Sequence, residues 1–243
     1  MPNCKVTVMV ESISVISNGD VPGSTLKPSP GKQNNAISAS LIYPRGGYAE
    51  ISGVVQADLE SNVPYQFDTA NFFGPDGDGV KAPGLFKGEE IEDFAPLKIQ
   101  VTTREDAGQL AGFISKVFCS LLNSAVKLVP GGQIVAAVLG AVTGGVGDLI
   151  TTESKKSDGS PSGPVEVIGT AKVSLDAASL LGGPNPLRMV LPLIAPNTIT
   201  KSWFETQTPP GGGPPQNVQV SGNLTTKGQP NGMIHLLIHV SPA

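Results

Sequence analysis

The chain has 243 residues, with 16 lysines and arginines against 20 aspartates and glutamates, so its formal net charge is −4. It contains 30 glycines and 22 prolines without a collagen-like period, which favours a turn-rich β protein over a helical or disordered one. No run of lysine or arginine supplies the basic surface that phosphate binding requires. Nucleic acid is therefore excluded as the expected partner.

The beginning of the chain and the cysteines predict its surroundings. Residues 5–16 read as a strand and lack the charged and apolar regions of a signal peptide, so an intracellular protein or part of an assembly is expected. Cys4 and Cys119 are too few for a disulfide framework and lack metal-ligand spacing. Two reduced thiols are predicted.

Alternating apolar and polar residues predict the strands of the first half. Val6, Val8 and Val10 share one face, and Ile13 and Val15 continue in the opposite phase, which predicts a bulge near residues 11–12. Further strands are predicted over residues 37–43, 48–56 and 97–101. Between the last two, residues 72–93 are expected to form an exposed acidic loop that contains Glu89, Glu90, Glu92 and Asp93.

The periodicity then changes to steps of three and four residues from Leu110 to Val129, which predicts an amphipathic helix that ends at Pro130. A second apolar stretch, residues 133–150, carries small residues at four-residue steps. Together the two stretches predict a helical hairpin over 104–150, followed by a polar linker over 151–164. Strand alternation resumes over 165–175, 187–194, 201–205, 218–224 and 233–240, so one domain over 1–243 is expected, with the hairpin as an insertion.

The order of these segments resembles a C2 domain, an antiparallel β-sandwich that docks on phospholipids, often through calcium. The stretch Leu97-Lys98-Ile99-Gln100-Val101-Thr102-Thr103-Arg104-Glu105 is similar to the family's strand L-x-I-x-V-x-D-x-D. Ile168-Gly169 before a strand, Ser202-Trp203-Phe204, and the closing Gly232-Met233-Ile234-His235-Leu236-Leu237-Ile238 look like three further elements. The resemblance implies a mainly β, C2-like antiparallel β-sandwich with an inserted helical hairpin.

The resemblance also implies where calcium would bind. Asp20 stands at one ligand position, and Glu105 or Asp106 at another, whereas Asn34, Asn35 and Thr103 replace carboxylates that a hard cation needs. A weak or absent calcium site is therefore expected. Asp76 and Asp78 begin like a calcium-binding loop whose later positions fail, so they form either a cation site or a solvated acidic loop; no other cofactor is expected.

The inserted hairpin would lie in the third loop, where C2 domains meet their targets. It is interpreted either as a cover packed on the sandwich or on another subunit, or as a device for shallow membrane insertion. Its uncharged run, residues 134–147, is shorter than the ~20 residues that span a bilayer. The residues expected to form the interface or to dock on a membrane are Leu110, Phe113, Phe118, Leu121, Gly140 and Gly144.

No motif for catalysis is present: there is no Walker lysine, no dinucleotide fingerprint and no G-x-S-x-G. His235 and His239 would lie roughly 13 Å apart on one strand face, too far to share a metal ion, and are expected to face solvent or an interface. Trp203 and Phe204 are read as core or rim aromatics. The sequence thus predicts a non-enzymatic structural or interaction protein that self-assembles or docks on a protein partner through its helical insertion. The alternative is a peripheral, largely calcium-independent membrane-binding module.

Overall fold

The computed structural model describes residues 3–21, 33–43, 48–51, 55–73, 82–104 and 166–243. In this part of the chain the secondary structure is almost entirely antiparallel strand, with one short helix. The elements are β1 (Asn3–Val15), β2 (Gln33–Tyr43), β3 (Tyr48–Ile51), β4 (Val55–Leu59), β5 (Tyr65–Gln66), β6 (Gly84–Glu92), β7 (Phe94–Arg104), β8 (Glu166–Asp176), α4 (Ala177–Gly182), β9 (Leu187–Ile194), β10 (Ile199–Gln207), β11 (Gln216–Thr225) and β12 (Pro230–Pro242).

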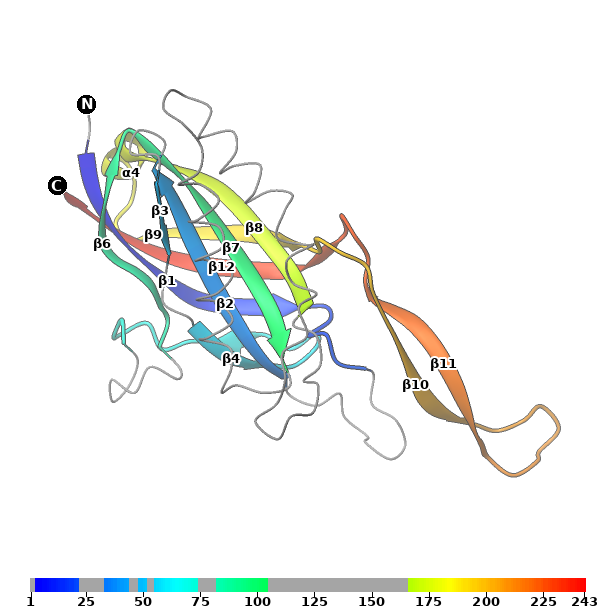
Figure 1. The fold of residues 1–243 in the computed structure, drawn as a ribbon. Helices are drawn as coiled ribbons and strands as arrows, with labels where there is room; N and C mark the ends of the chain where they lie inside the picture. The colour runs from blue at the N-terminus through cyan, green and yellow to red at the C-terminus, as the bar shows by residue number, and fades with distance from the viewer. Residues whose placement is uncertain (1–2, 22–32, 44–47, 52–54, 74–81, 105–165) are drawn as a thin grey trace, which may run out of the picture.

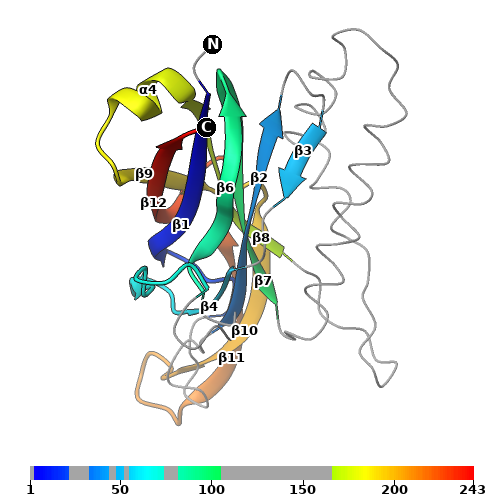
Figure 2. The ribbon, with the colours of Figure 1, turned by 90° about the vertical axis from the view of Figure 1, so that its left-hand side faces the viewer.

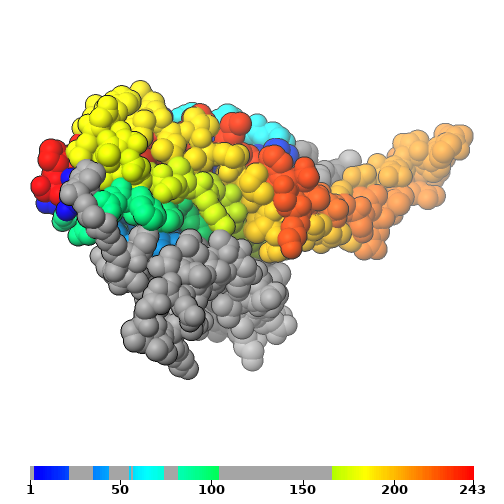
Figure 3. Space-filling model, turned by 90° about the horizontal axis from the view of Figure 1, so that it is seen from above, coloured from blue at the N-terminus to red at the C-terminus, as the bar shows by residue number. Residues whose placement is uncertain are grey.

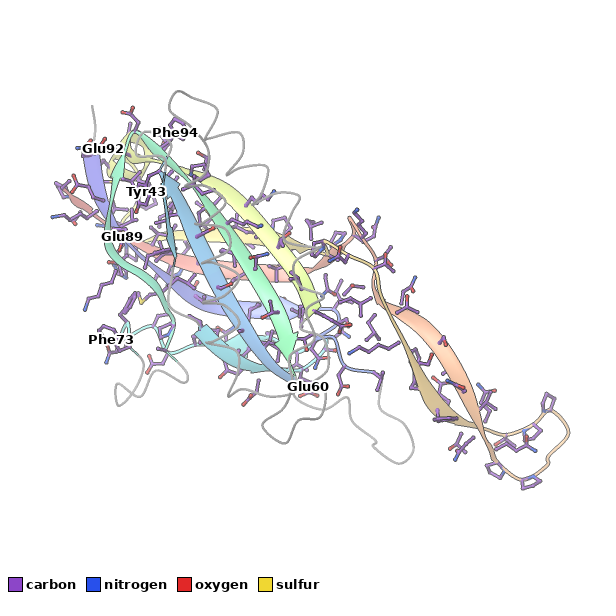
Figure 4. The ribbon with its side chains drawn as sticks, in the orientation of Figure 1. Tyr43, Glu60, Phe73, Glu89, Glu92 and Phe94 are labelled. Carbon is purple, nitrogen blue, oxygen red and sulfur yellow. The ribbon has the colours of Figure 1, made fainter. Side chains whose placement is uncertain are left out.

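Ten of the strands form one sheet, which we call the body, in the order β3-β2-β7-β8-β9-β12-β1-β5, with β4 also beside β2 and β6 beside β1. The sheet is nearly barrel-shaped (Figures 1 and 2). Strands β8 and β9 pair only at Thr170 and Ile194, so the sheet bends there. The end of β2 approaches β6 from across the curve of the sheet, and the Tyr43 hydroxyl donates to Glu89 Oε2 at 3.4 Å; both residues are labelled in Figure 4.

The core of the body lies inside this curve. Alternate residues of the long strands point inward and are fully buried, including Val8, Ile99 and Leu236. One face of each strand therefore supplies the apolar area whose removal from water stabilises the fold. Helix α4 adds Ala177 and Leu180 to this core, and it begins where the Asp176 carboxylate accepts a hydrogen bond from the Ser179 backbone N–H at 2.7 Å.

The predicted bulge in β1 is confirmed. The register against β12 shifts between Val10 and Ser12, so Val6, Val8 and Val10 before the shift and Ile13 and Val15 after it are all buried. The extra residue lets both phases of the sequence face the core. The prediction of a mainly antiparallel β protein is likewise confirmed, and the rolled sheet is consistent with a β-sandwich.

Several predicted boundaries differ from the observed ones. The end of the expected acidic loop is strand β6, in which Glu89 and Glu90 lie opposite Val6 and Lys5 of β1. Apolar residues of β6, such as Leu85 and Ile91, are buried. The acidic residues between them made this strand look like an exposed loop in the sequence. Arg104, assigned to the start of the helical hairpin, ends β7 instead. Helix α4 was not expected, and the rest of the predicted hairpin, with the linker 151–164, lies outside the described residues.

Candidate functional site

One end of the body gathers the loop after β1 with the ends of β2 and β7, where the C2 resemblance places its first and third loops (Figure 1). Gly19 of this loop has a φ of +88°, and a Cβ at this position would lie 2.7 Å from Thr103 Cγ2. Only glycine allows both the backbone conformation and the close approach. The loop therefore packs directly on β7.

Three buried asparagines connect this end of the body. Asn18 Nδ2 donates to the carbonyl of Leu59 at 2.9 Å, and Asn35 Nδ2 donates to the carbonyls of Asn18 and Thr102. Asn231 accepts from the Ser17 backbone N–H at 3.0 Å and donates to the Ser17 and Ile168 carbonyls at 2.8 and 2.9 Å. These amides bond backbone groups of the loop after β1 and of the neighbouring strands β4, β7 and β8, so their role is structural.

A lysine from outside the body contributes the positive charge of this site. Lys201 Nζ donates to the Gly19 carbonyl at 2.8 Å and lies 3.1 Å from Glu166 Oε2. An ammonium group, paired with the Glu166 carboxylate, is thus held against the loop that carries Asp20. Asp20 Oδ1 accepts a hydrogen bond from the Val21 backbone N–H at 2.9 Å.

The other predicted calcium ligands, Glu105, Asp106, Asp76 and Asp78, lie outside the described residues. Within the part of the chain that the structure describes, no group of three or more histidine, cysteine or acidic side chains is arranged to hold a metal ion. A calcium site at Asp20 therefore remains a prediction, and Lys201 is a feature that the family resemblance did not anticipate.

The residues predicted for docking, Leu110, Phe113, Phe118, Leu121, Gly140 and Gly144, also lie outside the described residues, as does Cys119. Both roles of the predicted hairpin remain predictions. Among the described helices, none has the length and apolar character needed to cross a bilayer. Cys4 is buried in the core, and this burial, together with the charge of Asp176, raises the pKa of its thiol.

Both histidines lie on the outward face of β12, as the alternation along this strand predicted. His235 is half-buried and His239 is exposed, while Ile234, Leu236 and Ile238 between and beside them are buried. Alternation along β12 thus turns both imidazoles away from the core. Within the described residues, no group of three or more histidine, cysteine or acidic side chains gathers around them to hold a metal ion.

Strands β10 and β11 form a separate two-stranded sheet, which we call the ribbon. It leaves the body at the end where Lys201 is anchored and extends well beyond it (Figures 1 and 3). The two strands were predicted from sequence, but as strands of the sandwich, and this placement is wrong. The loop between them, residues 208–215, contains only threonine, proline and glycine. That composition after a strand was the available signal for a hairpin.

The two faces of the ribbon differ in chemistry. On one face, polar pairs link the strands: Thr200 with Asn223 at 2.7 Å, Ser202 with Ser221 at 2.6 Å and Thr206 with Asn217 at 2.9 Å. Trp203 lies on the other face opposite Val220, and a Cβ added to Gly222 would lie 2.7 Å from its ring. The indole N–H donates to Glu205 Oε1 at 2.8 Å.

The ribbon also exposes apolar side chains. Phe204 is 57% exposed and Val218 is 39% exposed, and neither lies against the body's core. The prediction that Trp203 and Phe204 are core or rim aromatics is therefore corrected, because both stand on a projecting ribbon. No protein-family model matches the chain, and no curated protein matches it. The C2 resemblance therefore remains a prediction, and the ribbon is the candidate site that the described residues offer.

Proposed function

We propose that this protein is a non-catalytic structural or interaction protein that self-assembles or docks on a protein partner, and that the ribbon makes the contact. The single observation that carries the proposal is a two-stranded sheet that projects from the body with exposed apolar side chains. A two-stranded sheet is marginally stable in water and gains stability when more strands or another surface cover it. A partner would supply that cover.

The composition of the ribbon supports the same proposal. Over residues 199–225, Lys201 and Glu205 are the only charged residues. Lys201 is bound to Gly19 and Glu166 of the body, and Glu205 accepts from Trp203, so both charges already have partners within the chain. Protein interfaces are depleted of charge at their centre and enriched in exposed aromatic side chains such as Phe204. The helical insertion is proposed as a second contact, on the sequence evidence given above.

The experiment is the solution mass of the full-length chain, measured by size exclusion with light scattering over a range of concentrations and with or without calcium. We expect a species above the monomer mass of 24.9 kDa, with a mass that calcium does not change. Phe204→Glu should lower this mass, because it replaces an exposed apolar side chain of the ribbon with a charge. Phe94→Glu is the matched control, since Phe94 is 48% exposed on the body.

This experiment distinguishes self-assembly from docking on a different protein. If the wild-type chain stays monomeric at every concentration, self-assembly fails and docking on a different protein remains. If wild-type and Phe204→Glu chains behave identically both in self-association and in binding to any purified partner, the ribbon does not make the contact and the proposal is wrong.

A further inference from the structure

The ribbon presents two outer strand edges. Within the described residues, β10 and β11 pair only with each other, so one edge of each strand carries backbone N–H and C=O groups without a neighbouring strand. Such an edge is a template for pairing with another chain, and soluble proteins commonly guard it with charged residues or proline. An edge without charged residues or proline is called unguarded below.

The two edges differ in charge. Strand β10 carries Lys201 and Glu205, and Lys201 fixes that strand to the body. Strand β11, with the sequence QNVQVSGNLT, contains no charged residue and no proline. Its residues alternate between a polar row and a row that includes Val218 and Val220, which suits a continuous ladder. The edge of β11 is therefore the unguarded one.

The side chains of β11 are also complementary to themselves. About a two-fold axis an antiparallel strand meets its own copy, so each residue faces residues of the same strand. Gln219 and Asn217 carry amides that both donate and accept, and they can pair with the same groups across the axis without like-charge repulsion. A charged partner would find no opposite charge on this edge. An uncharged edge with self-complementary amides thus favours a second copy of the chain.

The length of β11 is sufficient for a stable contact between two ribbons. A ten-residue strand extends over ~30 Å, and two ribbons side by side make a four-stranded sheet, which is large enough for independent stability when one face is apolar. Trp203, Val218 and Val220 of each copy would lie on that shared face. Such a contact buries on the order of 1,000 Å², near the lower limit for a specific interface, so a weak, concentration-dependent dimer is expected.

We propose that β11 pairs antiparallel with β11 of a second copy of this chain, so that two ribbons join into one four-stranded sheet. This inference rests on the proposed function and names both its partner and its contact edge. Gln219 lies near the middle of the strand, is exposed, and makes no side-chain hydrogen bond among those described. A substitution at Gln219 therefore breaks no described side-chain hydrogen bond of the ribbon, in which its cross-strand neighbour is Phe204.

The test compares Gln219→Lys with Gln207→Lys by light scattering and analytical ultracentrifugation. Gln219→Lys brings two ammonium groups together across the axis, and we expect at least a tenfold rise in the dimer dissociation constant. Gln207→Lys adds the same charge to an exposed position at the end of β10, and we expect a change of less than twofold. Circular dichroism and thermal unfolding of the two variants should match the wild type.

A cross-linking measurement locates the contact independently. Gln219→Cys and Ser221→Cys, treated separately with a short bis-maleimide, should give covalent dimers, whereas Gln207→Cys should give no more than the unsubstituted chain with its own Cys4 and Cys119. Preferential cross-linking at position 207 would overturn the assignment to β11.

Failure of this inference can be told apart from failure of the proposed function. A wild-type assembly that Gln219→Lys leaves intact, while Phe204→Glu dissociates it, overturns edge pairing through β11 and retains self-assembly by the ribbon. A wild-type chain that stays monomeric at every concentration up to ~1 mM, the weak end of the affinity scale, overturns the inference and leaves only docking on a different protein.

Discussion

The body and the ribbon are built from strands with the same alternating pattern, yet they are stabilised in different ways. In the body, alternate residues such as Val8, Ile99 and Leu236 are completely buried against the opposite side of a rolled sheet. In the ribbon, Trp203 across Gly222 and polar pairs such as Ser202–Ser221 hold two strands together with both faces accessible. Alternation of apolar and polar residues thus specifies that a segment forms a strand. The stability of that strand depends on the surface against which its apolar face packs.

The largest expected effect separates the two regions directly. Ile99→Ala removes a fully buried side chain from β7, and we expect the free energy of unfolding to fall by about 2–5 kcal/mol. Phe204→Ala removes an exposed side chain from the ribbon, and we expect a change within about 0.5 kcal/mol. Urea denaturation of both variants measures the difference, and equal losses would show that the ribbon shares the stability of the body.

The second effect concerns the polar groups that close one end of the body. Asn231→Ala leaves the Ser17 backbone N–H and the Ser17 and Ile168 carbonyls without this partner, and we expect a loss of about 2–3 kcal/mol. Asn217→Ala, which removes one exposed hydrogen bond to Thr206 in the ribbon, should cost less than about 1 kcal/mol. The same denaturation series tests both, and a reversed order would contradict the structural role of Asn231.

A pH-dependent effect is expected from a lysine in the body. Lys98 is buried in β7, and this burial, together with the charge of Lys172 beside it, lowers its pKa to about 8 from the ordinary value of 10.5. Between pH 8 and pH 10.5 the unfolded chain therefore binds a proton that the folded chain releases, so this group makes stability rise with pH across that window. Below pH 8 Lys98 is protonated in the folded chain as well, so the full cost of burying its charge lowers the free energy of unfolding.

Lys98→Met should remove this dependence. At pH 7 we expect the variant to be more stable than the wild type by about 1–3 kcal/mol, and the difference should shrink as the pH is raised toward 10.5. The measurement is the free energy of unfolding of both chains at pH 7, 8.5 and 10. A constant difference between the chains over this range would contradict the lowered pKa, and Lys227→Met is the control at an exposed position away from β7.

The smallest effect is confined to the ribbon. Trp203→Ala removes the ring that covers Gly222, and we expect the ribbon's local opening free energy to fall by about 1 kcal/mol while global unfolding stays unchanged. Hydrogen exchange of the β10 and β11 amides measures the first quantity, and thermal unfolding measures the second. Faster exchange in β7 as well would mean that the ribbon is coupled to the body.

The sequence predicted the elements of this protein better than their arrangement. The β1 bulge could be found because the phase of its valines and isoleucines reverses within one strand, which is a local signal. The ribbon strands were also predicted, but the local sequence does not show whether a strand belongs to the body or to a separate sheet. Val218 and Val220 alternate as core residues do, and what distinguishes them is that no strand of the described part of the chain belongs to their sheet besides β10 and β11.

Two further features had weak or misleading signals. Strand β6 was hidden because its outward residues are glutamates, which resemble a solvated loop when read without their buried neighbours Leu85 and Ile91. At the predicted calcium position, Asp20 was found from a family pattern, but the pattern could not supply Lys201, which reaches Gly19 from 182 residues further along the chain. Such long-range contacts arise from the fold and have no local trace in the sequence.

The position of Trp203 has a practical consequence for following these regions in solution. It is the only tryptophan of the chain, and it lies on the ribbon, whereas the described part of the body absorbs and emits through its tyrosines. Excitation that is selective for tryptophan therefore produces emission from the ribbon and not from the body. The emission wavelength and quenching of that single fluorophore will report the ribbon's surroundings without an attached dye, independently of the circular dichroism of the body.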